Sequence, residues 1–75
     1  MNELEIWKKL PSKGQMYIYD DYEGLAIRLY ITKGVIKCNF KRKSKREYLG
    51  DFTSAFIRES IYNGNEITKE DYDRL

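Results

Sequence analysis

The chain contains no histidine, one cysteine and one proline, and these scarcities exclude several classes of protein. A zinc site built from the usual nitrogen and sulfur ligands is excluded, as is catalysis by a serine–histidine or cysteine–histidine pair. Cys38 has no disulfide partner within the chain, so we expect a small buried residue in a reducing compartment. No stretch is long and apolar enough to cross a bilayer.

Length and motifs favour a small binding protein over an enzyme. The 75 residues predict one domain (1–75), close to the size at which a single core is marginally sufficient. There is no glycine-rich phosphate loop, and we expect no enzymatic activity, no cofactor and no metal. The carboxylates of Asp20, Asp21 and Glu23 lack the spacing of an EF-hand loop, and we assign them to hydrogen bonds within a turn. The acidic N-terminus lacks the apolar run of a signal peptide, which predicts a cytoplasmic protein.

Charge is the most unevenly distributed property of the sequence. The formal net charge is +2, yet residues 28–46 carry eight Lys or Arg and no acid, whereas residues 1–27 and 47–75 carry net charges of −2 and −4. The stretch IKCNFKRKSKRE (36–47) begins with alternating apolar and polar residues and then places five cations in six positions. Such segregation is typical of a surface that binds a polyanion, although a well-solvated loop is the alternative.

Alternation of apolar and polar residues from Gln15 to Lys41 predicts three antiparallel strands. Loops at 33–34 and 21–24 would bring apolar residues of neighbouring strands opposite one another, in the pairs Ile31/Ile36, Leu29/Cys38, Ile27/Phe40, Ile18/Ile27 and Met16/Leu29. A slip of one residue would turn every side chain to the other face, so this agreement supports the register.

A short helix is expected before the strands. Asn2 can cap a helix that runs to about Leu10, with Leu4, Trp7 and Leu10 on its apolar face, and Pro11 should end it. After the basic run, residues 46–52 predict a short fourth strand whose place in the sheet is open.

Helices are also expected near the C-terminus. Residues 53–64 favour a helix capped by Thr53 and ended by Gly64, with a hairpin turning at Asn63-Gly64 as the alternative. Thr68 and Asp71 have capping-box-like spacing and predict a final short helix. The sequence thus predicts an α+β fold, a three- or four-stranded antiparallel meander with a short N-terminal helix and one or two C-terminal helices packed on one face.

The register also predicts what the outer, water-facing side of the meander carries. Tyr17, Arg28 and Asn39 should form one cross-strand row, with Tyr19 and Lys41 in the next. Tyrosine interleaved with cations contacts phosphates and stacks on bases, although such residues are also ordinary on a wet sheet face and at protein interfaces. The candidate nucleic-acid-binding residues are Tyr17, Tyr19, Arg28, Tyr30, Lys37, Asn39, Lys41, Arg42, Lys43, Lys45 and Arg46.

Two functional hypotheses follow. In the first, a small non-enzymatic protein, expected to be encoded by a phage or mobile element, binds nucleic acid, with DNA preferred to RNA. Neutralising about six phosphates would give log K a slope of roughly −5 against log salt. In the second, the protein is a protein-binding module or an inhibitor of a host enzyme, which uses the same tyrosine-rich face and the acidic C-terminal region. Oligomeric state is open in both.

The proposed element order, three antiparallel strands and then a helix, is similar to that of the arm-type DNA-binding domains of phage-type integrases and of the plant AP2 domain. The resemblance is one of architecture and carries no family motif. It implies that strands, rather than a recognition helix, would approach the nucleic acid.

Overall fold

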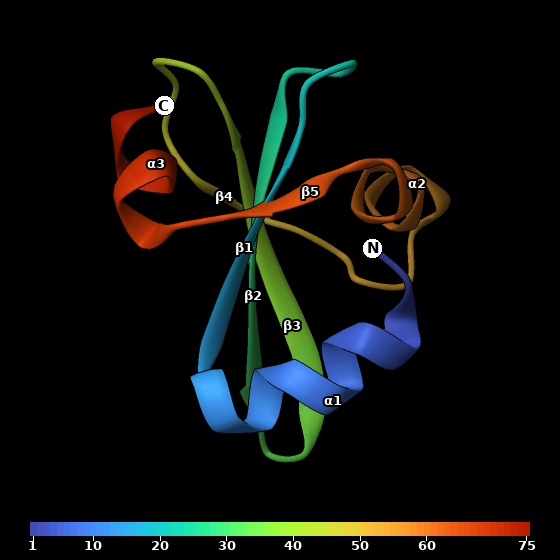
Figure 1. The fold of residues 1–75 in the computed structure, drawn as a ribbon. Coiled ribbons are helices and arrows are strands. Elements are labelled where there is room, and N and C mark those ends of the chain that lie inside the picture. The colour runs from blue at the N-terminus through green and yellow to red at the C-terminus, as the bar shows by residue number, and fades with distance from the viewer.

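A computed structural model describes all 75 residues and confirms the α+β class. Five antiparallel strands form one open sheet in the order β4-β3-β2-β1-β5, with three helices packed against it (Figure 1). The elements in chain order are α1 (Glu3–Lys13), β1 (Gln15–Asp20), β2 (Leu25–Thr32), β3 (Val35–Arg42), β4 (Tyr48–Leu49), α2 (Ala55–Asn63), β5 (Asn65–Ile67) and α3 (Lys69–Arg74). None of the helices combines the length and apolar character needed to span a membrane.

The predicted register of the meander is confirmed at every expected pair. Ile31 lies opposite Ile36 across the β2–β3 hairpin, and Ile18 lies opposite Ile27 between β1 and β2. Lys33 and Gly34 form the two-residue loop, with φ angles of 51° and 76°. Positive φ at both central positions matches the right-handed twist of the flanking strands, which is why such a short turn holds this register.

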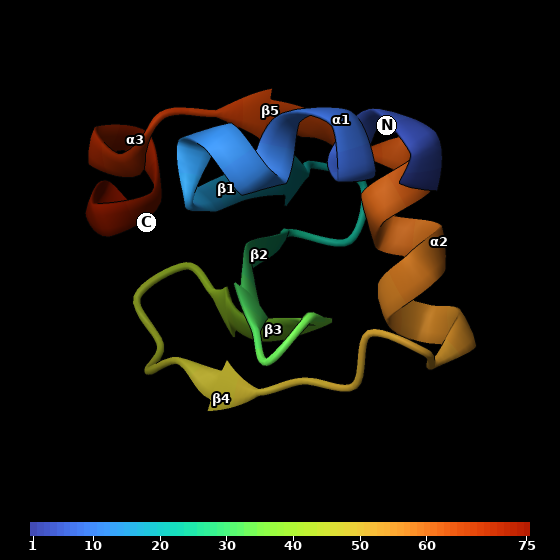
Figure 2. The ribbon, with the colours of Figure 1, turned by 90° about the horizontal axis from the view of Figure 1, so that it is seen from below.

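The core lies between the inner face of the sheet and the helices α1 and α2. Ile6 and Leu10 of α1 and Ile57 and Ile61 of α2 pack on buried strand residues such as Ile27. Figure 2 shows α1 beside β1 and β5, with α2 along the neighbouring side. The lone Cys38 is fully buried in this core, as expected.

Two predicted helix boundaries are wrong. Helix α1 continues through Pro11 to Lys13, because a proline in the last turn removes only one backbone donor. Its buried residues are Ile6 and Leu10, whereas Leu4 and Trp7 are exposed. The expected apolar face is therefore confirmed at Leu10 and wrong at Leu4 and Trp7, whose place in the core is taken by Ile6.

The N-cap of α2 is Ser54 rather than Thr53. The Ser54 hydroxyl accepts the N–H of Ile57 at 3.2 Å. Thr53 lies one residue before the cap, and its hydroxyl is directed back to the Asp51 carboxylate, to which it donates at 2.6 Å. The helix is confirmed over the alternative hairpin, and it ends at Gly64 as predicted.

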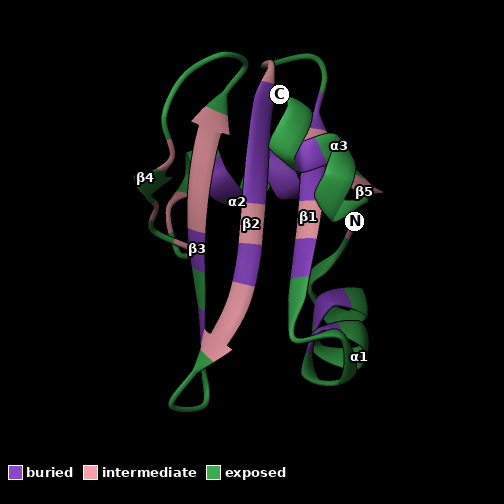
Figure 3. Cartoon of the chain, turned by 90° about the vertical axis from the view of Figure 1, so that its left-hand side faces the viewer, coloured by how far each residue is buried: buried purple, intermediate pink, exposed green.

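The segment after α2 was not predicted as a strand. Gly64 crosses so close to β1 that an added Cβ would lie 2.7 Å from Ile18 Cγ2, and the chain then pairs with β1 as β5. The predicted helix at Thr68 is confirmed as α3, whose cap accepts the N–H of Asp71 at 3.1 Å. Helix α3 lies on the face of the sheet opposite α2 (Figure 3). This placement decides how much of the outer face is open.

Candidate nucleic-acid interface

The outer face contains the predicted cross-strand rows. Tyr17 pairs with Arg28 and Arg28 with Asn39, while Ala26 joins Tyr19 to Lys41. The five side chains other than Ala26 are half-buried rather than exposed. The side-chain oxygen of Asn39 is buried without a hydrogen-bond partner, so it faces the protein and not the solvent.

Helix α3 covers part of this face. Tyr72 is only 3% exposed, and its ring centroid lies 5.0 Å from that of Tyr17. The Lys41 ammonium on β3 lies 4.5 Å from the centroid of the Tyr72 ring, which is a cation–π contact. Tyr72 thus contacts side chains of both β1 and β3. The expectation of an open outer face is therefore wrong where α3 docks. Figure 3 shows α3 in front of β1 and β2, while β3 lies uncovered beside it.

Beside α3, Arg28 already has an anionic partner. Its Nε and Nη2 donate to the two oxygens of Glu47 at 3.0 and 2.8 Å, and the Tyr72 hydroxyl donates to Glu47 at 2.6 Å. The hydrogen bond from Arg28 holds the pKa of Glu47 below its usual range, and the Tyr72 hydroxyl adds to this effect. Burial, followed by the bond to Glu47, raises the pKa of Tyr72. Both groups therefore stay in their bonded charge states at neutral pH.

The basic loop between β3 and β4 is different, because its cations point outward. The N–H of Lys45 donates to the carbonyl of Arg42 at 3.0 Å, and Ser44 has a φ of 63°, so the chain turns tightly here. Arg42 donates to the backbone carbonyl of Glu23 and joins the loop to the β1–β2 turn. Lys43, Lys45 and Arg46, like Arg42, are exposed.

Ion pairing separates this basic segment from the rest of the chain. Of the eight cations in residues 28–46, only Arg28 has a carboxylate partner. Of the six cations elsewhere, four are paired: Lys9, Lys13, Arg58 and Lys69. None of the other seven forms an ion pair with the acidic flanks of the sequence. Flank carboxylates do lie nearby, because Glu47 and Asp51 act electrostatically on Lys41 and Lys37, and Asp71 lines the same surface hollow as Lys43. The positive potential of the segment is therefore only partly compensated.

Sequence reasoning missed Tyr48 as a surface aromatic beside these cations. Tyr48 is 46% exposed as a residue, and the Arg46 guanidinium carbon lies 4.8 Å from its ring centroid. Its other neighbour is Phe40, at a centroid distance of 6.0 Å and an interplanar angle of 30°. The available signal was an aromatic residue two positions after the last cation of the run, in the predicted fourth strand.

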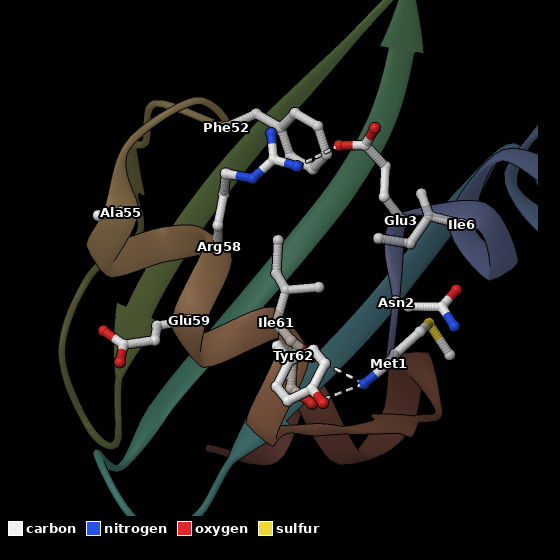
Figure 4. A pocket seen from close by; sticks show the side chains of 10 residues that line it. All are labelled: Met1, Asn2, Glu3, Ile6, Phe52, Ala55, Arg58, Glu59, Ile61 and Tyr62. Carbon is white, nitrogen blue, oxygen red and sulfur yellow. Dashed lines mark hydrogen bonds and ion pairs between the residues drawn. The ribbon is translucent and has the colours of Figure 1, made fainter.

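Away from the basic segment, the largest cavity, about 550 Å³, lies between α1 and α2 (Figure 4). Ile6 and Ile61 are among its apolar lining residues, and the ion pair between Arg58 and Glu3 bridges it at 2.5 Å. The Met1 ammonium donates to backbone carbonyls at the end of α2 at 2.9 and 3.0 Å. No candidate nucleic-acid-binding residue lines this cavity.

Of the three turn carboxylates, Asp20 has the structural role expected for it, whereas the side chains of Asp21 and Glu23 accept no hydrogen bond within the turn. Asp20 is buried, and its Oδ1 accepts the backbone N–H groups of Tyr22 and Glu23 at 3.1 and 3.5 Å. These bonds close the β1–β2 turn that receives Arg42 from the basic loop.

Comparison with protein-family models, curated proteins and solved structures finds no match to this chain. The functional proposal therefore rests on the contacts and charges of this chain alone.

Proposed function

We propose that this protein binds nucleic acid, without catalysis, through a basic rim formed by Lys37 and Arg42 on β3 and by Lys43, Lys45 and Arg46 in the loop that follows. The observation that carries the proposal is the lack of any carboxylate partner for these five exposed cations. Clustered cations without internal counter-ions repel one another, and phosphates relieve that repulsion while releasing condensed counter-ions. If the basic run were only a well-solvated loop, the exposed cations without an ion pair would be confined to that loop. They also include Lys37 on β3.

Within this proposal the residues under α3 have a supporting role. Tyr17 and Lys41 pack on Tyr72, and the charge of Arg28 is neutralised by Glu47. They hold α3 and the end of the basic loop in place, and the rim makes the phosphate contacts. Tyr30 stays beside the rim, opposite Lys37, with the Arg28 guanidinium 5.0 Å from its ring centroid.

Salt dependence tests the proposal most directly. Binding of labelled DNA and RNA, followed by fluorescence anisotropy across a salt series, should give a slope of about −4 to −5 in log K against log salt on duplex DNA if all five cations contact phosphates. The absence of binding at low salt, or a salt-insensitive interaction, would reject the proposal.

A matched pair of triple variants separates the rim from bulk charge. Replacing Lys43, Lys45 and Arg46 by Gln should reduce the magnitude of the duplex slope by about 2.7, since each lost phosphate contact accounts for about 0.9. The control removes the same charge from α1, with Gln at Lys8, Lys9 and Lys13, and should leave the slope unchanged. Equal effects of the two variants would show that net charge alone is responsible.

The partner and the compartment remain part of the proposal. A stoichiometric protein partner that survives nuclease treatment of a lysate would favour the protein-binding module instead. An unpaired thiol in the core is in keeping with a reducing compartment, which supports the cytoplasm as the site of action.

A further inference from the structure

Tyr48 and Arg46 form a cation–π contact at the base of the basic loop. Tyr48 is 46% exposed as a residue on the short edge strand β4, and the guanidinium 4.8 Å from its ring centroid has no ion pair. Phe40 supports the ring from the neighbouring strand at 6.0 Å. An exposed aromatic ring held on a strand beside unpaired cations has the two components of a single-strand binding groove.

We propose that Tyr48 stacks on an unpaired base and that the ligand of the basic rim is single-stranded nucleic acid; this inference rests on the proposed function. Stacking of a base on an aromatic side chain improves affinity by about 5- to 150-fold. Displacing an exposed cation–π partner costs only about 2- to 5-fold. The base therefore displaces Arg46 from the ring, and the released guanidinium contacts the base or the adjacent phosphate.

Duplex DNA does not offer this contact. Its bases are already stacked and paired, and extracting one costs about a hundredfold or more in affinity, which offsets most or all of the gain from one ring. Single strands and loops expose the faces of their bases without that cost.

Other exposed tyrosines are poorer candidates because of their surroundings. Tyr22 lies between Asp21 and Glu23, whose carboxylates repel a phosphate backbone. Tyr62, which is 71% exposed, lies on α2 and lines the cavity between α1 and α2. No residue of the basic rim lines that cavity. Tyr30 is half-buried, and the Arg28 guanidinium over its ring is paired with Glu47. Tyr48 is exposed and has a cation without an ion pair over its ring.

The test compares a labelled oligothymidine with a duplex of equal length, using anisotropy at low salt. Tyr48→Ala should weaken oligothymidine binding by about 5- to 150-fold and leave the salt slope unchanged, because no phosphate contact is lost. Duplex binding should be unaffected. Tyr48→Phe should keep wild-type affinity, since it retains the ring, and Tyr62→Ala is the matched control on α2. Circular dichroism and thermal unfolding check that each variant is folded.

The outcomes distinguish failure of the stacking inference from failure of the proposed function. The stacking inference is overturned, and the basic rim is left intact, if the wild type shows salt-dependent binding that prefers duplex. The same holds if Tyr48→Ala weakens binding equally for both ligands, or for neither. Should Tyr48→Ala fail to fold, loss of affinity in Tyr48→Phe would count against ring stacking. If the wild type binds neither ligand, the proposed function fails and this inference fails with it.

Discussion

Removing only the hydroxyl of Tyr72 tests how α3 is held on the sheet. In Tyr72→Phe the ring stays buried against Tyr17, while the 2.6 Å hydrogen bond to Glu47 is lost. Glu47 keeps both bonds from Arg28, so the variant leaves no buried charge without a partner. A hydrogen bond to a charged acceptor contributes about 1.5–3 kcal/mol to stability. Since the Glu47 side chain is 29% exposed, we expect the lower end, a loss of about 1.5 kcal/mol.

Urea and thermal unfolding measure this loss. For a chain of this length, about 1.5 kcal/mol corresponds to a decrease in Tm of roughly 6–12 °C. A double-mutant cycle with Glu47→Gln isolates the contact between the two side chains from their other interactions. The pKa of Glu47 is lowered in the folded state, so its stabilising contribution is present above about pH 4.3 and is lost as the pH falls through the folded value. The coupling measured by the cycle should therefore shrink in acid.

Tyr62→Phe is the matched control, because the Tyr62 side chain is 71% exposed on α2. Its unfolding free energy should stay within about 0.5 kcal/mol of the wild type. A Tyr72→Phe variant as stable as this control, with a coupling to Glu47 near zero, would refute the idea that the hydroxyl helps to hold α3.

Two further predictions concern the core. Burial raises the pKa of the Cys38 thiol to about 11, so the native protein should react slowly with thiol reagents. The folded thiol stays protonated where the unfolded one ionises, so unfolding free energy should fall by about 1.4 kcal/mol per pH unit above about pH 8.5, and Cys38→Ala should lack this part of the decline. Gly64→Ala would place a Cβ 2.7 Å from Ile18 Cγ2 and 2.8 Å from the carbonyl oxygen of Ser60. We expect a destabilisation of about 1–3 kcal/mol in urea unfolding, and wild-type stability would show that β5 can move away from β1.

Local pattern in the sequence determined the three-stranded meander and its two faces. Side chains alternate with a period of two along a strand, and the short loops allow one register that pairs apolar with apolar residues. The same local reasoning found the caps Asn2 and Thr68, because a cap bonds to a backbone group only three residues away. The same reasoning was wrong by a few residues at Pro11, where the helix continues to Lys13, and by one residue at Thr53, where Ser54 is the cap.

Only the tertiary structure decided which parts of the outer face remain open. The strand β5 and the docking of α3 rest on contacts between distant segments, such as the bond from Tyr72 to Glu47 across 25 positions of the chain. Glu47 and Arg28 are separated by 19 positions, so no local pattern in the sequence indicated that they form a pair. These contacts assign Arg28 to the folded body and leave the basic rim unpaired. The sequence located the positive charge, and long-range packing determined which of those cations face the solvent.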